Sequence, residues 1–177
     1  MTPSRSVRLV IHAARAVFVV FTLAASALAS AQTYSCTTSI GTNVAFGVYD
    51  PSSGTPGLAS ATAQVTCTHT GGGSVRVGWD MQLASGGSGN CTARRMNGPS
   101  GSTLTYNIYQ NSVASGVWGS ASCGSYPSGQ FQLSPGNPNN QKTATNVLYG
   151  QLPTGQFGAA AGGYSDTLRL TVTWNTL

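Results

Sequence analysis

Charged and titratable side chains are scarce in this chain. Only 6% of its 177 residues are charged, and its acidic residues are Asp50, Asp80 and Asp166. After residue 31 the chain contains no glutamate, and its one histidine is His69. General acid–base catalysis needs positioned titratable groups, and a serine hydrolase of the α/β type would show a G-x-S-x-G elbow, which is absent. A secreted hydrolase is therefore the least favoured function.

Paired carboxylates, phosphate-binding glycine loops and clusters of metal ligands are also missing. A glycosidase needs two carboxylates at a fixed separation, and no such pair stands out. Asp50 and Asp166 lie beside turn or strand-start signals, where an aspartate accepts hydrogen bonds from nearby backbone N–H groups. We therefore expect no catalytic, cofactor-binding or metal-binding residue, and no enzyme.

Residues 1–31 are predicted to be a secretory signal peptide. Arg5, Arg8 and Arg15 precede the apolar run "AVFVVFTLAA", and "ALASA" offers cleavage after Ala29 or Ala31. The alternative, a membrane anchor, needs about 20 apolar residues. We expect export through the periplasm to the cell surface or the medium, as one domain over residues 32–177 with no membrane span.

Removing the signal peptide weakens the basic character of the chain. Three of the eight Lys and Arg residues lie in it, so the formal net charge falls from +5 to +2. The five remaining basic residues are scattered over about 146 positions. A nucleic-acid footprint would gather them on one face, so no nucleic-acid partner is expected.

Four cysteines, an even number, lie in the exported part. They are Cys36, Cys67, Cys91 and Cys123. In an oxidising compartment this predicts two disulfides rather than a metal site, because there is no C-x-x-C motif. Three connectivities are open, and we favour Cys36–Cys67 with Cys91–Cys123.

Short alternating runs separated by Gly-, Pro-, Ser- and Asn-rich turns fill the exported part. Alternation of apolar and polar residues is typical of half-buried strands. The predicted strands cover residues 43–49, 61–68, 74–83, 104–109, 143–152 and 167–174. With no long amphipathic helix, this pattern predicts an all-β sandwich.

The last run leaves an apolar strand edge with no following sequence to pair with it. Leu168, Leu170, Val172 and Trp174 share one face of it. Exposing each would forgo roughly 1.5–3 kcal/mol, and a flat apolar edge promotes aggregation. Either another part of this chain or another chain is expected to cover it.

Aromatic residues offer a further hypothesis, carbohydrate binding by a surface adhesin. Trp79 and Trp174 fall on the apolar phases of their strands and are expected in the core. Trp118, in "GVWGSASCG", and Tyr126 fall in loops. They are the candidate surface contacts.

An ordered set of motifs resembles the spore coat protein U domain, a family that includes subunits of Csu-type, or archaic, chaperone–usher pili. The motifs run from Cys36 to Trp174: "SCTTSIGTNVAFGVYDP", "AQVTCT", "RRMNGPSGSTLTYNIYQN", "VWG", "VLYGQLPTGQ" and "GYSDTLRLTVTW". The resemblance implies an immunoglobulin-like sandwich that lacks its final strand. A strand from a periplasmic chaperone would fill the groove first. A strand from the neighbouring pilin subunit would then replace it at the usher.

The same resemblance implies further expectations. The chaperone would hold the free carboxylate of Leu177. A polymerising subunit needs a donor segment of about ten residues, whereas cleavage after Ala31 leaves only "QTYS" before Cys36. This predicts a subunit at the fibre tip or a minor subunit. A stand-alone secreted coat or matrix protein, complete by itself, is the alternative.

Overall fold

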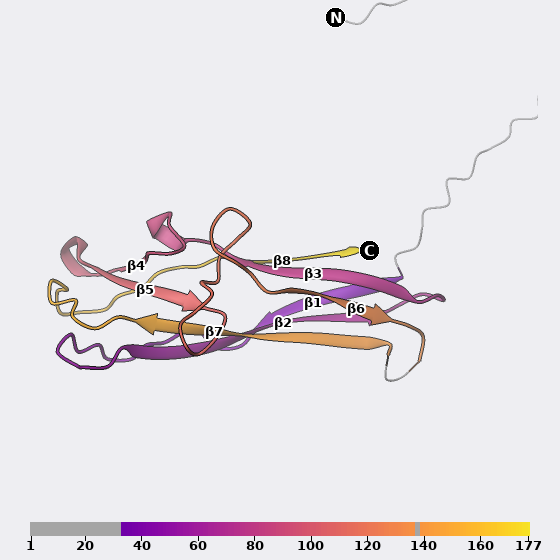
Figure 1. The fold of residues 1–177 in the computed structure, drawn as a ribbon, viewed down its shortest axis with the longest axis horizontal. Coiled ribbons are helices and arrows are strands. Elements are labelled where there is room, and N and C mark those ends of the chain that lie inside the picture. Colours follow the sequence, from indigo (N-terminus) through magenta and orange to yellow (C-terminus); the bar gives the residue numbers. More distant parts are fainter. Residues whose placement is uncertain (1–32, 137–138) are drawn as a thin grey trace, which may run out of the picture. The chain divides into compact units, whose positions relative to one another are not determined.

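The described part of the chain forms two antiparallel β-sheets packed as a sandwich (Figure 1). The computed structural model describes residues 33–136 and 139–177, and the predicted signal peptide lies outside them. The strands are β1 (Tyr34–Ile40), β2 (Gly57–His69), β3 (Val75–Leu83), β4 (Arg94–Asn97), β5 (Thr103–Tyr109), β6 (Ser128–Leu133), β7 (Gln141–Leu152) and β8 (Leu170–Thr176). There are also two short 3₁₀ turns: η1 (Gly86–Ser88) lies between β3 and β4, and η2 (Pro99–Gly101) lies between β4 and β5. The prediction of an all-β sandwich is confirmed.

Each sheet places its apolar side chains between the two layers. The five-stranded sheet has the order β1-β2-β7-β5-β4, and the three-stranded sheet has the order β6-β3-β8. On β2, Ala63, Val65 and Cys67 are buried, while the residues between them stay at the surface. β3 repeats the pattern with Val77 and Met81. This period of two puts one face of each sheet in the core.

Both disulfides form, in the connectivity that the sequence favoured. Cys36 pairs with Cys67, which lies directly opposite it on the neighbouring strand. Cys91 pairs with Cys123 and joins the segment before β4 to the loop between β5 and β6. A crosslink that closes a loop of this length stabilises a domain by about 2–4 kcal/mol.

Strand β8 pairs with β3 on one side only. In their register Trp174 lies opposite Trp79, and Leu170 lies opposite Leu83. The predicted alternation holds, since Leu168, Leu170, Val172 and Trp174 are half-buried against the core. The strand begins at Leu170 rather than Thr167, and its other edge meets no strand among the described residues.

The strand predicted over residues 43–49 is wrong. Val44 and Phe46 are half-buried, but Val48 is 100% exposed. Gly47 has a φ of 71°, in the left-handed region that breaks an extended run. The chain leaves the sheet after Gly41, whose N–H still donates to the Thr62 carbonyl, and residues 42–48 join no ladder among the described residues.

Candidate functional site

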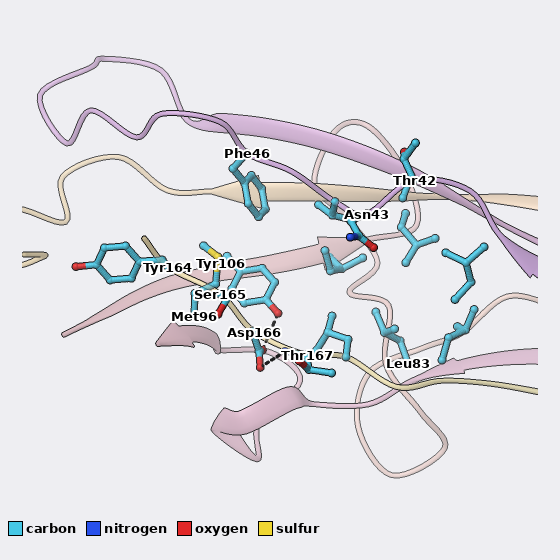
Figure 2. A pocket seen from close by; sticks show the side chains of 17 residues that line it. Thr42, Asn43, Phe46, Leu83, Met96, Tyr106, Tyr164, Ser165, Asp166 and Thr167 are labelled. Atoms are coloured by element: carbon cyan, nitrogen blue, oxygen red, sulfur yellow. Dashed lines mark hydrogen bonds between the residues drawn. The ribbon is translucent and has the colours of Figure 1, made fainter. Parts of the chain in front are cut away.

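A groove separates the segment that follows β1 from the segment that leads into β8. Its central hollow has a volume of about 460 Å³. Figure 2 shows side chains from both segments around it. One wall comes from Ile40, Val44 and Phe46, the other from Leu168 and Leu170, and the floor from Ala61, Leu83, Ile108 and Leu148.

The groove continues toward the loops at one end of the sandwich. A second hollow of about 800 Å³ lies between residues 44–51 and 159–164, and it shares Val44, Phe46 and Tyr164 with the first. At the other end the hydroxyls of Thr176 and Tyr34 lie 3.4 Å apart. The start of β1 and the end of β8 thus approach each other there.

Both walls of the groove carry backbone groups without a partner. Within the described residues, no backbone hydrogen bond joins residues 42–48 to another part of the chain. The facing edge of β8 is likewise unpaired. Buried backbone N–H and C=O groups are normally satisfied. An extended segment laid between these walls could form ladder bonds with both.

Packing on a glycine, rather than hydrogen bonding, holds the first wall. A Cβ added at Gly150 of β7 would lie 2.6 Å from Cγ1 of Val44 and 2.8 Å from Cζ of Phe46. Figure 2 shows Phe46 near Tyr106, and their ring centroids are 5.9 Å apart in an edge-on contact. Residues 44–46 thus pack directly against the backbone of Gly150, which has no side chain.

Asp166 ties the second wall to the rest of the domain. Its carboxylate accepts hydrogen bonds from the Tyr106 hydroxyl at 2.7 Å and the Thr167 N–H at 2.8 Å (Figure 2). It also accepts one from the Gly87 N–H at 3.1 Å. Burial and the hydrogen bond to Asp166 raise the pKa of Tyr106. The prediction that Asp166 accepts a nearby backbone N–H group is confirmed by the bond from Thr167.

Arg94 is fully buried on β4, directly opposite Tyr106 of β5. The sequence had shown it only as one of the scattered basic residues. Its guanidinium donates to the carbonyls of Ala84, Cys91 and Trp118 and to Oδ1 of Asn107, at 2.7–3.1 Å. Burial lowers its pKa. These bonds join four separate segments at one point.

The prediction that Trp118 lies at the surface is wrong. Its side chain is 0% exposed, and its Nε1 donates to the carbonyl of Met81 at 2.8 Å. The Cys91–Cys123 disulfide and the Arg94 bond to the Trp118 carbonyl fold this loop inward. Tyr126 is half-buried against the core.

The four residues predicted to line a partner groove separate into two pairs. Leu168 and Leu170 line the central hollow. Val172 and Trp174 continue the same face of β8 but do not line either hollow. The opposite wall, Ile40 with residues 44–46, was missed as part of this site, although its alternation was visible in the sequence.

The described residues contain neither a cluster of metal-ligating side chains nor a membrane-spanning helix. No group of three or more His, Cys, Asp or Glu side chains lies close enough together to hold a metal ion. No helix in residues 33–136 and 139–177 is long and apolar enough to cross a membrane.

Comparison with known proteins identifies the family. No curated protein matches the chain. The family model described as the Spore Coat Protein U domain matches residues 20–171, which is more than half of the sequence. Together with the two-sheet, disulfide-linked sandwich, this match shows that the chain belongs to the Spore Coat Protein U domain family.

Proposed function

We propose that this protein is a non-enzymatic structural subunit of a Csu-type chaperone–usher pilus, exported to the cell surface. In this proposal the groove accepts an extended strand from another chain. The observation that carries it is the pair of facing walls, residues 42–48 and the edge of β8 that faces away from β3. The backbone groups of this segment and of this edge have no partner among the described residues.

The apolar surface of the groove supports the same proposal. Ile40 is 59% exposed, and Leu168 and Leu170 are only half-buried. Fully burying such a side chain stabilises a protein by roughly 1.5–3 kcal/mol. An inserted strand would bury the parts of these side chains that are still exposed, a gain of a few kcal/mol. This is a substantial share of the stability of a domain, about 5–15 kcal/mol.

The proposed partners follow from the family. A periplasmic chaperone would lend its strand first, and a neighbouring pilin subunit would replace it at the outer-membrane usher, by β-strand addition. The tip or minor position and the capture of the Leu177 carboxylate stay predictions.

A matched pair of variants tests the groove. Leu170 faces the hollow, whereas Thr171, next to it, faces solvent. The full chain is produced in a periplasm with a chaperone of this pilus class, and the one-to-one complex is measured by size exclusion. We expect Leu170→Lys to lower the recovered complex by about tenfold or more, because it places a charge in an apolar contact. Thr171→Lys should leave it unchanged.

Two results would contradict the proposal. The first is a wild-type protein that folds as a monomer and does not bind the chaperone, which would favour the self-complete coat protein. The second is a complex that Leu170→Lys and Thr171→Lys weaken equally, because the groove would then play no part in it.

A further inference from the structure

The outer face of the five-stranded sheet carries regular rows of hydroxyl and amide side chains. Thr37, Thr66 and Thr143 lie side by side on β1, β2 and β7, and Ser39, Gln64 and Thr145 form the next row. We call these six residues the hydroxyl array. Neighbouring strands lie about 4.8 Å apart and alternate residues along a strand about 6.8 Å, so the array is a lattice of hydrogen-bonding groups.

The array has no formal charge. Lys142 alternates with Thr143 and so belongs to the opposite face of β7, and Arg95 is on β4 at the far edge of the sheet. The outward positions of the three-stranded sheet, in contrast, include Arg76 and Asp80. A charged ligand would therefore find no counter-charge on the array.

Most of the hydrogen-bonding capacity of the array is unused. Thr66 and Thr143 share one hydroxyl–hydroxyl bond of 2.8 Å. The side chains of Thr37, Ser39, Gln64 and Thr145 have no hydrogen-bond partner among the described residues. The members on β1 and β7 are exposed. Each free hydroxyl can both donate and accept.

Two aromatic rings lie further along the same face, separated from the array by Val147 on β7. Tyr149 is on the same face of β7, four residues beyond Thr145, and Tyr109 of β5 lies directly opposite it. Both are half-buried. A tyrosine combines an apolar ring face with a polar hydroxyl, which suits the apolar face of a sugar ring.

We propose that this face, the hydroxyl array with Tyr109 and Tyr149, binds a neutral polysaccharide. Uncharged hydroxyls and amides match the hydroxyls of a sugar chain, and the tyrosines would stack against its rings. The absence of charge favours a neutral chain over an acidic one. The face is separate from the groove, so this inference does not depend on strand insertion.

Affinity electrophoresis tests the inference. Protein produced from the full chain and recovered from the periplasm is run in native gels containing laminarin, dextran or the acidic polymer alginate. We expect retardation by laminarin or dextran and none by alginate. The double variant Thr66→Val/Thr143→Val keeps the side-chain shapes and should weaken binding about tenfold, as the loss of two hydrogen bonds of about 0.5–1.5 kcal/mol implies. Thr171→Val, on the other sheet, should change nothing.

Tyr149→Ala should also weaken binding, with thermal unfolding of each variant as the folding control. If Tyr149→Ala fails to fold, the double Thr→Val variant decides alone. Retardation by neither neutral glucan would overturn the inference. So would stronger retardation by alginate, retardation that the double variant does not alter, or self-association through the array without glucan binding.

Discussion

The two edges along which the sheets approach each other differ in their backbone hydrogen bonding. Along one edge of the segment that leads into β8, Ser165 and Asn97 of β4 exchange backbone hydrogen bonds of 2.8 and 3.0 Å, so the chain itself joins the two sheets there. We call this the closed side. On the other side, β1 and β8 face each other across the groove, and residues 42–48 have no backbone bond to another described segment. We call this the open side.

Polar groups show the same contrast. On the closed side even a buried arginine has its donors satisfied by the carbonyls around it. On the open side whole rows of backbone groups are unpaired. The chain therefore satisfies the backbone and side-chain groups of the closed side itself, and the unpaired backbone groups of the open side are those that the proposed donor strand would pair with.

Breaking the closed side should have the largest effect. Arg94→Met would leave the carbonyls of Cys91 and Trp118 without their Arg94 donors and would remove one of the two donors to Oδ1 of Asn107, the Ile108 N–H being the other. Each buried unsatisfied group costs about 1–3 kcal/mol, so we expect a loss of about 3–5 kcal/mol in the free energy of unfolding, measured in urea. Arg95→Met, at an exposed neighbouring position, should cost less than about 0.5 kcal/mol. Equal losses would show that the network around Arg94 is unimportant.

Displacing the wall of the open side should have an intermediate effect. Gly150→Ala places a methyl group against Val44 and Phe46, and overpacking of this kind costs about 1–3 kcal/mol. Thermal unfolding would measure it. Gly54→Ala is the control, because nothing lies within 4 Å of a Cβ at Gly54. An unchanged melting temperature in Gly150→Ala would mean that residues 44–46 are not seated on β7.

The smallest expected effect is that of Tyr106→Phe, which removes the hydrogen bond to Asp166. We expect a loss of about 1 kcal/mol at neutral pH. Because the folded state raises the pKa of Tyr106, its contribution is complete below the ordinary tyrosine pKa of about 10 and declines above it, where only the unfolded state loses the proton. Urea unfolding from pH 7 to 11 should show this decline in the wild type and a smaller one in Tyr106→Phe. A decline of equal size in both would contradict the role of Tyr106.

Regular alternation made much of the fold predictable. It located most of β2, β3, β5, β7 and β8 and the faces that they bury, because a half-buried strand repeats every two residues. It missed β1, β4 and β6. In β1 most side chains are polar and exposed, and β4 contains a buried arginine in place of an apolar residue.

Segment 43–49 and Trp118 show what local patterns cannot reveal. The alternation in the segment was real, but the chain leaves the sheet after Gly41, and Gly47 then breaks the extended run. The sequence predicts that Trp118 lies in a loop at the surface, whereas in the structure its side chain lies in the core. It is buried because a disulfide and Arg94 draw the loop inward. Both outcomes depend on contacts between residues far apart in the sequence. Of the site, the second wall, Leu168 and Leu170, was predicted from the sequence. The part that the first wall, Ile40 with residues 44–46, plays in the groove was not.

Backbone hydrogen exchange at residues 42–48, in the free protein and in the chaperone complex, tests the central claim most directly. Amides without a partner exchange quickly, whereas amides in a strand ladder are protected. We predict nearly unprotected exchange in these residues when the protein is free, and protection by about a hundredfold or more in the complex. Strong protection already in the free protein, unchanged by the chaperone, would show that the chain completes its own sandwich and would contradict the account.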